Sequence, residues 1–308
     1  MIRVLFAGRD PVFDAYEEPL RAAFKEAGLD VDLSREHPAN RVDYIVLEPS
    51  GPITDFSPFI NAKAVLNLWA GVETLVGNST LTQPLARMVD PGLTEGMVEW
   101  VVGYTLFHHL EIGSVLDKQD GSWSRVIPPL ARDRRVSVLG LGALGAAVAQ
   151  ALAALNFDVA GWSRRKKTMG FPTFAGGDGL QDILKHAEIL VLLLPKTPAT
   201  ENLLDATRLA LLPKGARIIN PGRGALIDDD ALLAALQSGQ VAHATLDVFR
   251  QEPLPGDHPF WAHPGVTVSP HVASETRPQT AARVIAENIR RGEAGEAFLH
   301  LVDRAAGY

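Results

Sequence analysis

The chain has 308 residues, a length typical of about two domains. Its net charge is −7 and its pI about 5.7, an acidic balance that argues against nucleic acid or an anionic membrane as the main partner. Because the chain has no cysteine, disulfides, thiolate zinc sites and cysteine nucleophiles are excluded, and no other residues indicate a metal site.

The residues Met1 to Asp10 form a short apolar run that closes with glycine and charged residues. The run is shorter than the apolar core of a signal peptide. No stretch reaches the roughly 18 apolar residues of a membrane-spanning helix. We therefore expect a cytoplasmic protein with no membrane partner.

Strand and helix patterns alternate up to about Asp90. Ile2 to Ala7 is typical of a buried strand and Asp14 to Glu26 of a helix, and Tyr44 to Leu47 and Ala64 to Leu68 are further short strands. This alternation predicts a parallel sheet with helices on its faces, which would make the segment a small α/β domain.

A long helical pattern follows Pro91 and Gly92 and runs from Thr94 to about Leu116. Its apolar residues are spread around the helix instead of forming one stripe. Such a pattern indicates a helix buried on several sides, between domains or against a second subunit.

A second alternating block begins at Val136. The expected strands are Val136 to Leu139, Val159 to Trp162, Ile189 to Leu194, Arg217 to Asn220, Ala244 to Val248 and Val266 to Ser269. A final helix is expected over about Pro278 to Arg291. The block predicts a second parallel sheet.

The first strand of this block leads into a G-x-G-x-x-G motif. Its glycines are Gly140, Gly142 and Gly145, with Ala143 and Leu144 between the last two. The first glycine permits a tight turn, the second lets a pyrophosphate approach the backbone, and the third lets the following helix pack on the strand. The pattern predicts dinucleotide binding, and the alternative is a glycine turn that serves packing alone.

The next strand ends at Ser163, where an NAD site would carry an acidic residue for the ribose hydroxyls. Serine followed by Arg164 and Arg165 would instead bind a 2′-phosphate, so we expect NADP(H) to be preferred over NAD(H). We interpret Lys167, at the end of the same basic run, as a solvated charge.

Arg223 lies on a glycine-flanked turn between the strand ending at Asn220 and a helix expected over Asp228 to Ser238. Ligands of open α/β sheets bind beyond the carboxyl ends of the strands. Arginine matches a carboxylate with two parallel hydrogen bonds. The position favours an anion site, with an ordinary surface arginine as the alternative.

Three more polar residues follow later strands: Asp247, Glu252 and His271. Arginine can bind and polarise a keto acid, histidine can donate a proton, and glutamate can orient the histidine and raise its pKa toward the working pH. Each residue alone has a structural explanation. Their order after a dinucleotide motif indicates one catalytic site that contains Arg223, Glu252 and His271.

At this point the chain resembles the D-isomer-specific 2-hydroxyacid dehydrogenase family, over nearly its whole length. The motifs that carry the resemblance are Gly140 to Gly145, Leu193 to Thr200, Asn220 to Asp228, Leu246 to Pro253 and Ser269 to His271. Leu68 to Val72, Trp162 to Arg164 and Val302 to Tyr308 are similar to the glyoxylate/hydroxypyruvate reductase A group of that family.

The resemblance implies that Arg223 binds the substrate carboxylate and carbonyl, that His271 is the acid/base with Glu252 as its partner, and that Asp247 sits by the nicotinamide. It also implies that the amides of Ala70 and Gly71 hold the carboxylate. The remaining candidate contacts are Leu194, Pro195 and Pro221 at the cofactor and Trp69 at the substrate, with ordinary packing between domains as the alternative for Trp69. Pro221 is unusual in this turn, where it removes one backbone donor and can alter the cofactor contacts. Trp123 either bounds the substrate pocket or packs between domains.

The resemblance further implies two Rossmann-like or flavodoxin-like α/β domains, with the cofactor domain (93–275) inserted into the substrate domain (1–92 and 276–308). A homodimer is expected. The implied reaction is NADPH-dependent reduction of small 2-keto acids, glyoxylate and hydroxypyruvate, in a cleft between the domains. One alternative is a larger substrate such as 3-phosphoglycerate, for which Arg87 is a candidate cation. The other is a protein that senses dinucleotides and binds partners.

Overall fold

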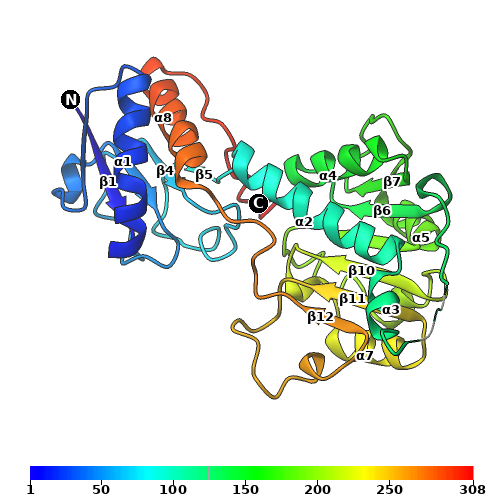
Figure 1. Ribbon diagram of the computed structural model, residues 1–308. Coiled ribbons are helices and arrows are strands. Elements are labelled where there is room, and N and C mark those ends of the chain that lie inside the picture. The colour runs from blue at the N-terminus through cyan, green and yellow to red at the C-terminus, as the bar shows by residue number, and fades with distance from the viewer. Residues whose placement is uncertain (122, 124, 308) are drawn as a thin grey trace. The chain divides into compact units, whose positions relative to one another are not determined.

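The computed structural model describes residues 1–121, 123 and 125–307 (Figure 1). Tyr308, the last residue of the closing motif, lies outside the described residues. The chain forms two compact units. Unit 1 comprises Met1–Leu93 together with the segment that begins at Glu275, and unit 2 comprises Thr94–Ser274. The two expected parallel-sheet α/β domains are therefore confirmed.

Unit 1 contains a parallel sheet with the strand order β2-β1-β3-β4-β5. Its elements are β1 (Ile2–Ala7), α1 (Asp10–Glu26), β2 (Val31–Ser34), η1 (Ala39–Arg41), β3 (Tyr44–Leu47), β4 (Ala64–Asn67), β5 (Leu85–Ala86) and α8 (Pro278–Ala294). Helices α1 and α8 lie side by side although they are far apart in sequence (Figure 1), and Leu20 and Ile285 belong to one buried core.

Unit 2 contains a seven-stranded parallel sheet with the order β12-β11-β10-β9-β6-β7-β8. Its first half comprises α2 (Pro91–His109), which begins in unit 1, α3 (Ile112–Asp117), η2 (Ala131–Asp133), β6 (Arg135–Leu139), α4 (Ala143–Ala154), β7 (Asp158–Ser163), β8 (Thr173–Ala175) and α5 (Gly176–His186). The second half comprises β9 (Ile189–Leu192), α6 (Ala206–Leu209), β10 (Ala216–Asn220), η3 (Gly224–Leu226), α7 (Asp229–Gln237), β11 (Val241–Leu246), η4 (Pro259–Trp261) and β12 (Val266–Val268).

The central strands of unit 2 are apolar on both faces. Successive residues of β9, Leu190 and Val191, are both fully buried but belong to different cores. Helices covering both faces of a parallel sheet produce this pattern. The sheet is thereby a rigid base from whose carboxyl edge the functional turns project.

The expected single helix from Thr94 to Leu116 is wrong. Helix α2 ends at His109, and Glu111 has a left-handed φ of 55° before α3 begins. After the break, the Glu111 carboxylate pairs with the partly buried Arg217 of β10 and lies 4.0 Å from the buried Arg134. Charge pairing thus interrupts a helix that the apolar pattern alone would continue.

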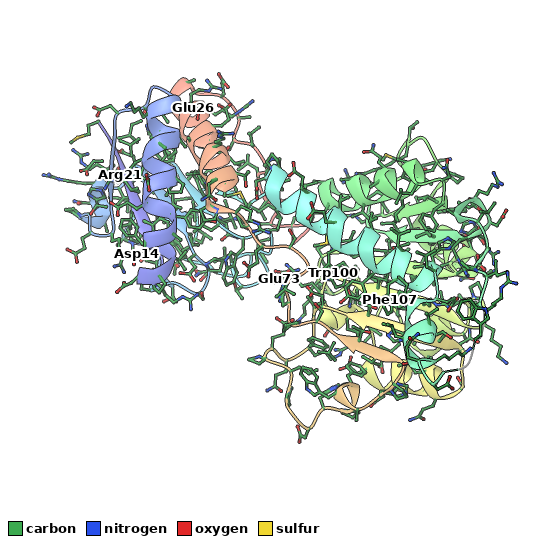
Figure 2. All side chains as sticks on the ribbon, in the orientation of Figure 1. Asp14, Arg21, Glu26, Glu73, Trp100 and Phe107 are labelled. Carbon is green, nitrogen blue, oxygen red and sulfur yellow. The ribbon has the colours of Figure 1, made fainter. Side chains whose placement is uncertain are left out.

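Within the single chain, helix α2 is buried along one stripe, and the expected burial of its other sides against a second subunit stays a prediction. The stripe contains Met97, Val101 and Thr105, which recur at a spacing of four residues. Trp100 and Phe107, both labelled in Figure 2, are only half-buried. The helix therefore keeps partly exposed apolar surface within the single chain.

Candidate active site

The glycine turn between β6 and α4 has the features that a dinucleotide requires. Gly140 has a φ of 104°, which side chains rarely adopt, and a Cβ on Gly145 would lie 1.7 Å from the Gly140 carbonyl oxygen. A Cβ on Gly142 would meet no atom within 4 Å, so the space in front of this residue is open. No side chain caps the N-terminus of α4, which suits a phosphate group. The turn fits a pyrophosphate.

Leu194 and Pro195 follow β9 and lie close to this turn. A Cβ on Gly140 would come within 2.4 Å of the Leu193 carbonyl oxygen. The Pro195 carbonyl accepts a hydrogen bond of 2.7 Å from the Thr200 hydroxyl, which shapes the following loop. The two segments that are expected to contact the cofactor are therefore neighbours.

The end of β7 shapes a basic loop beside the same turn. Ser163 is buried, and its hydroxyl donates to the Arg165 carbonyl over 2.6 Å, whereas the side chains of Arg164 and Arg165 are exposed. The basic run predicts a solvated charge at Lys167, but in the structure this residue also makes a hydrogen bond to the backbone. Its ammonium donates to the carbonyl oxygen of Leu141, inside the glycine turn.

The turn that carries Arg223 is held by the side chain of Asn220. This buried amide accepts a hydrogen bond of 3.1 Å from the Gly222 N–H and donates one of 3.0 Å to the Arg223 carbonyl. Pro221 has no N–H, so it needs no partner in the turn. A terminal nitrogen of the Arg223 guanidinium donates to the Gly222 carbonyl over 2.7 Å, which folds the side chain back over its own turn.

Gly224 lets this turn approach the loop that carries Glu252. A Cβ on Gly224 would lie 2.1 Å from the carbonyl carbon of Phe249, so no other residue fits without displacing the backbone. The charge of Arg223 acts on both side chains: it favours the ionised form of Glu252, and it opposes the net rise in the pKa of His271 that the hydrogen bond to Glu252 produces. The three residues proposed from the sequence are thus neighbours in unit 2.

Asp247 holds the backbone that presents His271. One carboxylate oxygen accepts from the Ser269 hydroxyl (2.6 Å) and the Val272 N–H (2.9 Å), and the other accepts from the Ala273 N–H (2.9 Å). His271 itself has a left-handed φ of 56°. A carboxylate that is 1% exposed and has three donors thereby stabilises a backbone conformation that histidine rarely adopts.

His271 and Glu252 form a hydrogen-bonded pair, with 2.7 Å between Nδ1 and Oε2. The hydrogen bond to Glu252, although opposed by partial burial, raises the pKa of His271, and the charges of Glu252 and Asp247 act in the same direction. Burial works to raise the pKa of Glu252, but hydrogen bonds from His271 and the Phe249 N–H lower it below its usual value. The pair therefore favours imidazolium beside carboxylate, and Nε2 remains as the ring nitrogen for a substrate.

Trp69, Ala70 and Gly71 belong to unit 1, in the turn after β4. The buried amide of Asn67 donates to the carbonyl oxygens of Trp69 (2.8 Å) and Gly71 (2.9 Å). Because the peptide unit is planar and trans, the Ala70 N–H points away from Asn67 and is presented by the turn. The Trp69 side chain is 45% exposed, and Trp123, in unit 2, is 94% exposed.

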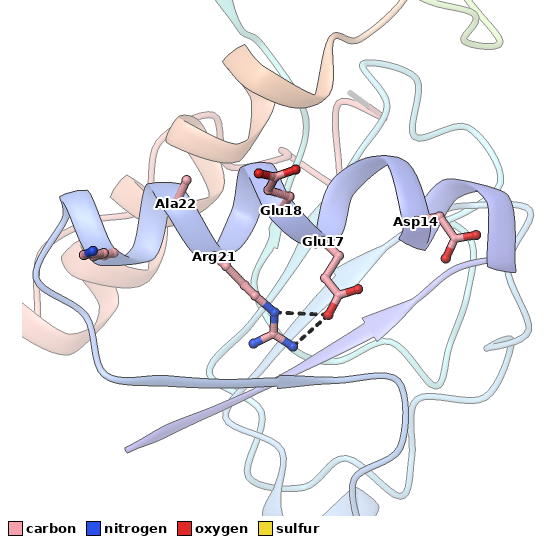
Figure 3. Close-up of a pocket in the computed structure, with 6 residues that line it drawn as sticks. Asp14, Glu17, Glu18, Arg21 and Ala22 are labelled. Atoms are coloured by element: carbon pink, nitrogen blue, oxygen red, sulfur yellow. Dashed lines mark hydrogen bonds and ion pairs between the residues drawn. The ribbon is translucent and has the colours of Figure 1, made fainter.

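A depression on α1 does not suit an anionic substrate (Figure 3). It is lined by Asp14, Glu17, Glu18, Arg21, Ala22 and Lys25. Arg21 is bound to Glu17 over 2.9 Å, so its charge is already compensated. The remaining carboxylates would repel a keto acid.

The sequence did not predict the roles of two asparagines, Asn67 and Asn220, or the contact made by Lys167. The two asparagines are the last residues of otherwise apolar strands, β4 and β10. A polar amide that ends a buried strand is a usable signal, since a buried amide requires partners. No comparable signal separates Lys167 from its basic neighbours.

Replacing two glycines of the motif by alanine separates the folding role from the binding role. Gly142→Ala should fold normally, because its Cβ meets no protein atom, but should weaken NADPH binding about tenfold or more by filling the open space. Gly145→Ala should lower the thermal midpoint, because its Cβ collides with the Gly140 carbonyl. Thermal melts and fluorescence titration with NADPH measure both effects. Unchanged NADPH affinity in Gly142→Ala would contradict this assignment.

Comparisons with known proteins agree with this geometry. Residues 109–273 match the D-isomer specific 2-hydroxyacid dehydrogenase, NAD binding domain. The chain is 40% identical over 256 residues to Glyoxylate/hydroxypyruvate reductase A of Serratia proteamaculans (strain 568), covering 80% of this chain and 82% of that relative.

Among the solved structures that are similar over the whole chain are the following two. One is a D-isomer specific 2-hydroxyacid dehydrogenase from Xanthobacter autotrophicus Py2 in complex with NADPH and MES, with a TM-score of 0.93, 43% identity and coverage of 100% and 99% of the two chains. The other is an NADPH-dependent glyoxylate/hydroxypyruvate reductase from Sinorhizobium meliloti in complex with NADP and sulfate, with a TM-score of 0.85, 33% identity and full coverage of both chains. The chain therefore belongs to the D-isomer-specific 2-hydroxyacid dehydrogenase family and is an NAD(P)-dependent oxidoreductase.

Proposed function

We propose that the protein reduces small 2-keto acids, glyoxylate and hydroxypyruvate, to 2-hydroxy acids with NADPH. The observation that carries the proposal is the His271–Glu252 pair beside Arg223, in the same unit as the glycine turn. The names of the Serratia and Sinorhizobium relatives support these two substrates.

The side chains of unit 2 have complementary roles in this reaction. When bound, a reduced nicotinamide supplies the hydride. Arg223 binds the keto acid through its carboxylate and polarises the carbonyl oxygen. His271 donates a proton to that oxygen from Nε2, and Glu252 keeps the imidazole protonated and oriented. Asp247 acts through the backbone by holding the His271 turn, in addition to any contact with the nicotinamide.

The preference for NADPH rests on the end of β7. Ser163 stands where an acidic residue would repel a 2′-phosphate, and Arg164 and Arg165 follow it with exposed side chains. The Xanthobacter and Sinorhizobium structures contain NADPH and NADP, respectively. A larger substrate such as 3-phosphoglycerate is not favoured, because the curated relative is named for the two small keto acids.

We further propose that unit 2 is the cofactor domain and that unit 1 is the substrate domain, whose Ala70 and Gly71 amides hold the substrate carboxylate. The Asn67-held turn supports that role, since it presents backbone N–H groups after a strand. We place the reaction in the cytoplasm. In the part of the chain that the structure describes, no helix has the length and apolarity to cross a bilayer.

Steady-state kinetics with both nicotinamide cofactors and a panel of 2-keto acids test the proposal. We expect NADPH to exceed NADH in kcat/KM on glyoxylate and hydroxypyruvate. Arg223→Ala should lose about a hundredfold or more, because it removes the fixed cation at the developing negative charge. Arg132→Ala, at an exposed arginine of the same unit, is the control and should match the wild type. Wild-type turnover by Arg223→Ala on every keto acid would refute the assignment.

The pH profile tests the His271–Glu252 pair. Reduction needs protonated His271, so kcat/KM should fall as pH rises through its pKa, which Glu252 raises above the usual value. Glu252→Gln removes that stabilisation and should move this alkaline limb to lower pH. Glu201→Gln, an exposed carboxylate of the same unit, should leave the limb in place. An unmoved limb in Glu252→Gln would show that the glutamate does not tune the histidine.

We also propose a homodimer that buries apolar surface near α2 and α3. Leu110, Val115 and Leu116 are 43%, 46% and 61% exposed, and the half-buried Trp100 adds to this surface. Light scattering at micromolar concentration should give twice the mass of the chain. Leu116→Glu should shift that mass toward the monomer because it buries a charge at the interface. A wild-type monomer would refute the proposal.

A further inference from the structure

We propose that Arg304 is a positioning residue for the substrate carboxylate, because it anchors residues 299–307, the edge segment, beside the strand that supports the turn at residues 69–71. The inference rests on the proposed function, in which backbone amides of that turn hold the carboxylate. It gives a role to the motif from Val302 to Tyr308, which contains none of the proposed catalytic side chains. The edge segment and the turn both belong to unit 1.

The edge segment covers the outer side of β5. This strand has only two residues and stands last in the sheet order, so β4 pairs with one of its sides alone. The edge segment runs antiparallel to β5 on the other side. The Val302 N–H donates to the Leu85 carbonyl over 2.8 Å, and the His300 carbonyl accepts from the Arg87 N–H over 3.0 Å. A strand this short gains stability from partners on both sides.

Two side chains anchor the edge segment. Near its start, the Leu299 N–H donates over 2.7 Å to Oδ1 of Asn288, a residue of α8 that is 2% exposed. Near its end, the Arg304 guanidinium donates to the carbonyl oxygens of Leu81 and Gln83, over 2.6 Å for Gln83. These two carbonyls belong to the backbone that leads into β5. Arg304 therefore joins the edge segment to the start of this strand through charge-assisted hydrogen bonds.

The residue after β5 reaches the turn at residues 69–71. The Met88 N–H donates to the Trp69 carbonyl over 3.0 Å, and the same carbonyl accepts from the Asn67 side chain over 2.8 Å. Because the peptide unit is planar and trans, holding this carbonyl oxygen fixes the direction of the Ala70 N–H. One of the two hydrogen bonds that orient the amide thus depends on β5 and, through β5, on the edge segment.

The expected effect of losing the Arg304 anchor follows from this arrangement. The Met88 donor becomes less well placed, whereas the Asn67 donor remains, so the amide is loosened and not lost. The substrate carboxylate does not change during hydride transfer, so weaker binding should raise KM and leave kcat nearly unchanged. The glycine turn belongs to unit 2, so the affinity for NADPH should be preserved.

Arg304→Met and Val302→Pro test the inference, with Arg41→Met as the control. The first variant removes the guanidinium, and the second removes the N–H that bonds to Leu85. Arg41 is an exposed arginine of unit 1, so its variant loses the same charge elsewhere. The measurements are steady-state kinetics on glyoxylate at saturating NADPH, calorimetric binding of NADPH, calorimetric binding of oxamate to the NADPH complex, and hydrogen exchange at residues 85–89. Oxamate has the shape and carboxylate of a small 2-keto acid but is not reduced.

We expect Arg304→Met and Val302→Pro to raise the KM for glyoxylate and the Kd of oxamate about threefold to tenfold, because the amide keeps only one of its two supports. The kcat and the Kd of NADPH should change less than about twofold. Hydrogen exchange at residues 85–89 should become faster in both variants, because β5 loses protection. Arg41→Met should match the wild type in every measurement.

Two results would overturn the inference. Faster exchange with unchanged KM and oxamate affinity would show that β5 loosens without affecting the substrate. Unchanged exchange in both variants would show that the edge segment does not stabilise β5. A wild type that neither reduces glyoxylate nor binds oxamate would instead refute the proposed function, so the two failures are distinguishable.

Discussion

The Asp247 carboxylate is the interaction on which the proton chemistry of unit 2 depends. Its two oxygens accept three hydrogen bonds from residues 269, 272 and 273, on both sides of His271. Without these acceptors, a histidine with a φ of 56° would relax toward an ordinary backbone conformation. The distance of 2.7 Å between His271 Nδ1 and Glu252 Oε2 therefore depends on the buried Asp247 carboxylate.

Asn220 and Asn67 apply the same principle to two other turns. Each is a buried side chain at the end of a parallel strand, and each bonds to the backbone of the turn that follows. A buried amide without partners would cost free energy, so the turn and the side chain stabilise each other. The residues expected to contact substrate are thus held by neighbours that need not touch it.

Much of this arrangement could be predicted from the sequence, because apolar runs locate parallel strands and polar residues just beyond them share one edge. The predicted residues Arg223, Glu252 and His271 do lie close together in the structure. The break at Glu111 could not be predicted, since it depends on Arg217 and Arg134, which are distant in sequence. The contact of Lys167 with Leu141 was missed for the same reason: a surface charge and a tertiary anchor have the same sequence pattern.

The distribution of residues between the two units has a consequence for how substrate range can change. The glycine turn, Arg223 and the His271–Glu252 pair all belong to unit 2, whereas the turn held by Asn67 belongs to unit 1. Under the proposed role of this turn in holding the substrate carboxylate, substitutions around Trp69 would alter which keto acid is accepted without touching the groups that set the His271 pKa. Selection or engineering for a new substrate can act on one unit while the acid and its carboxylate partner stay unchanged.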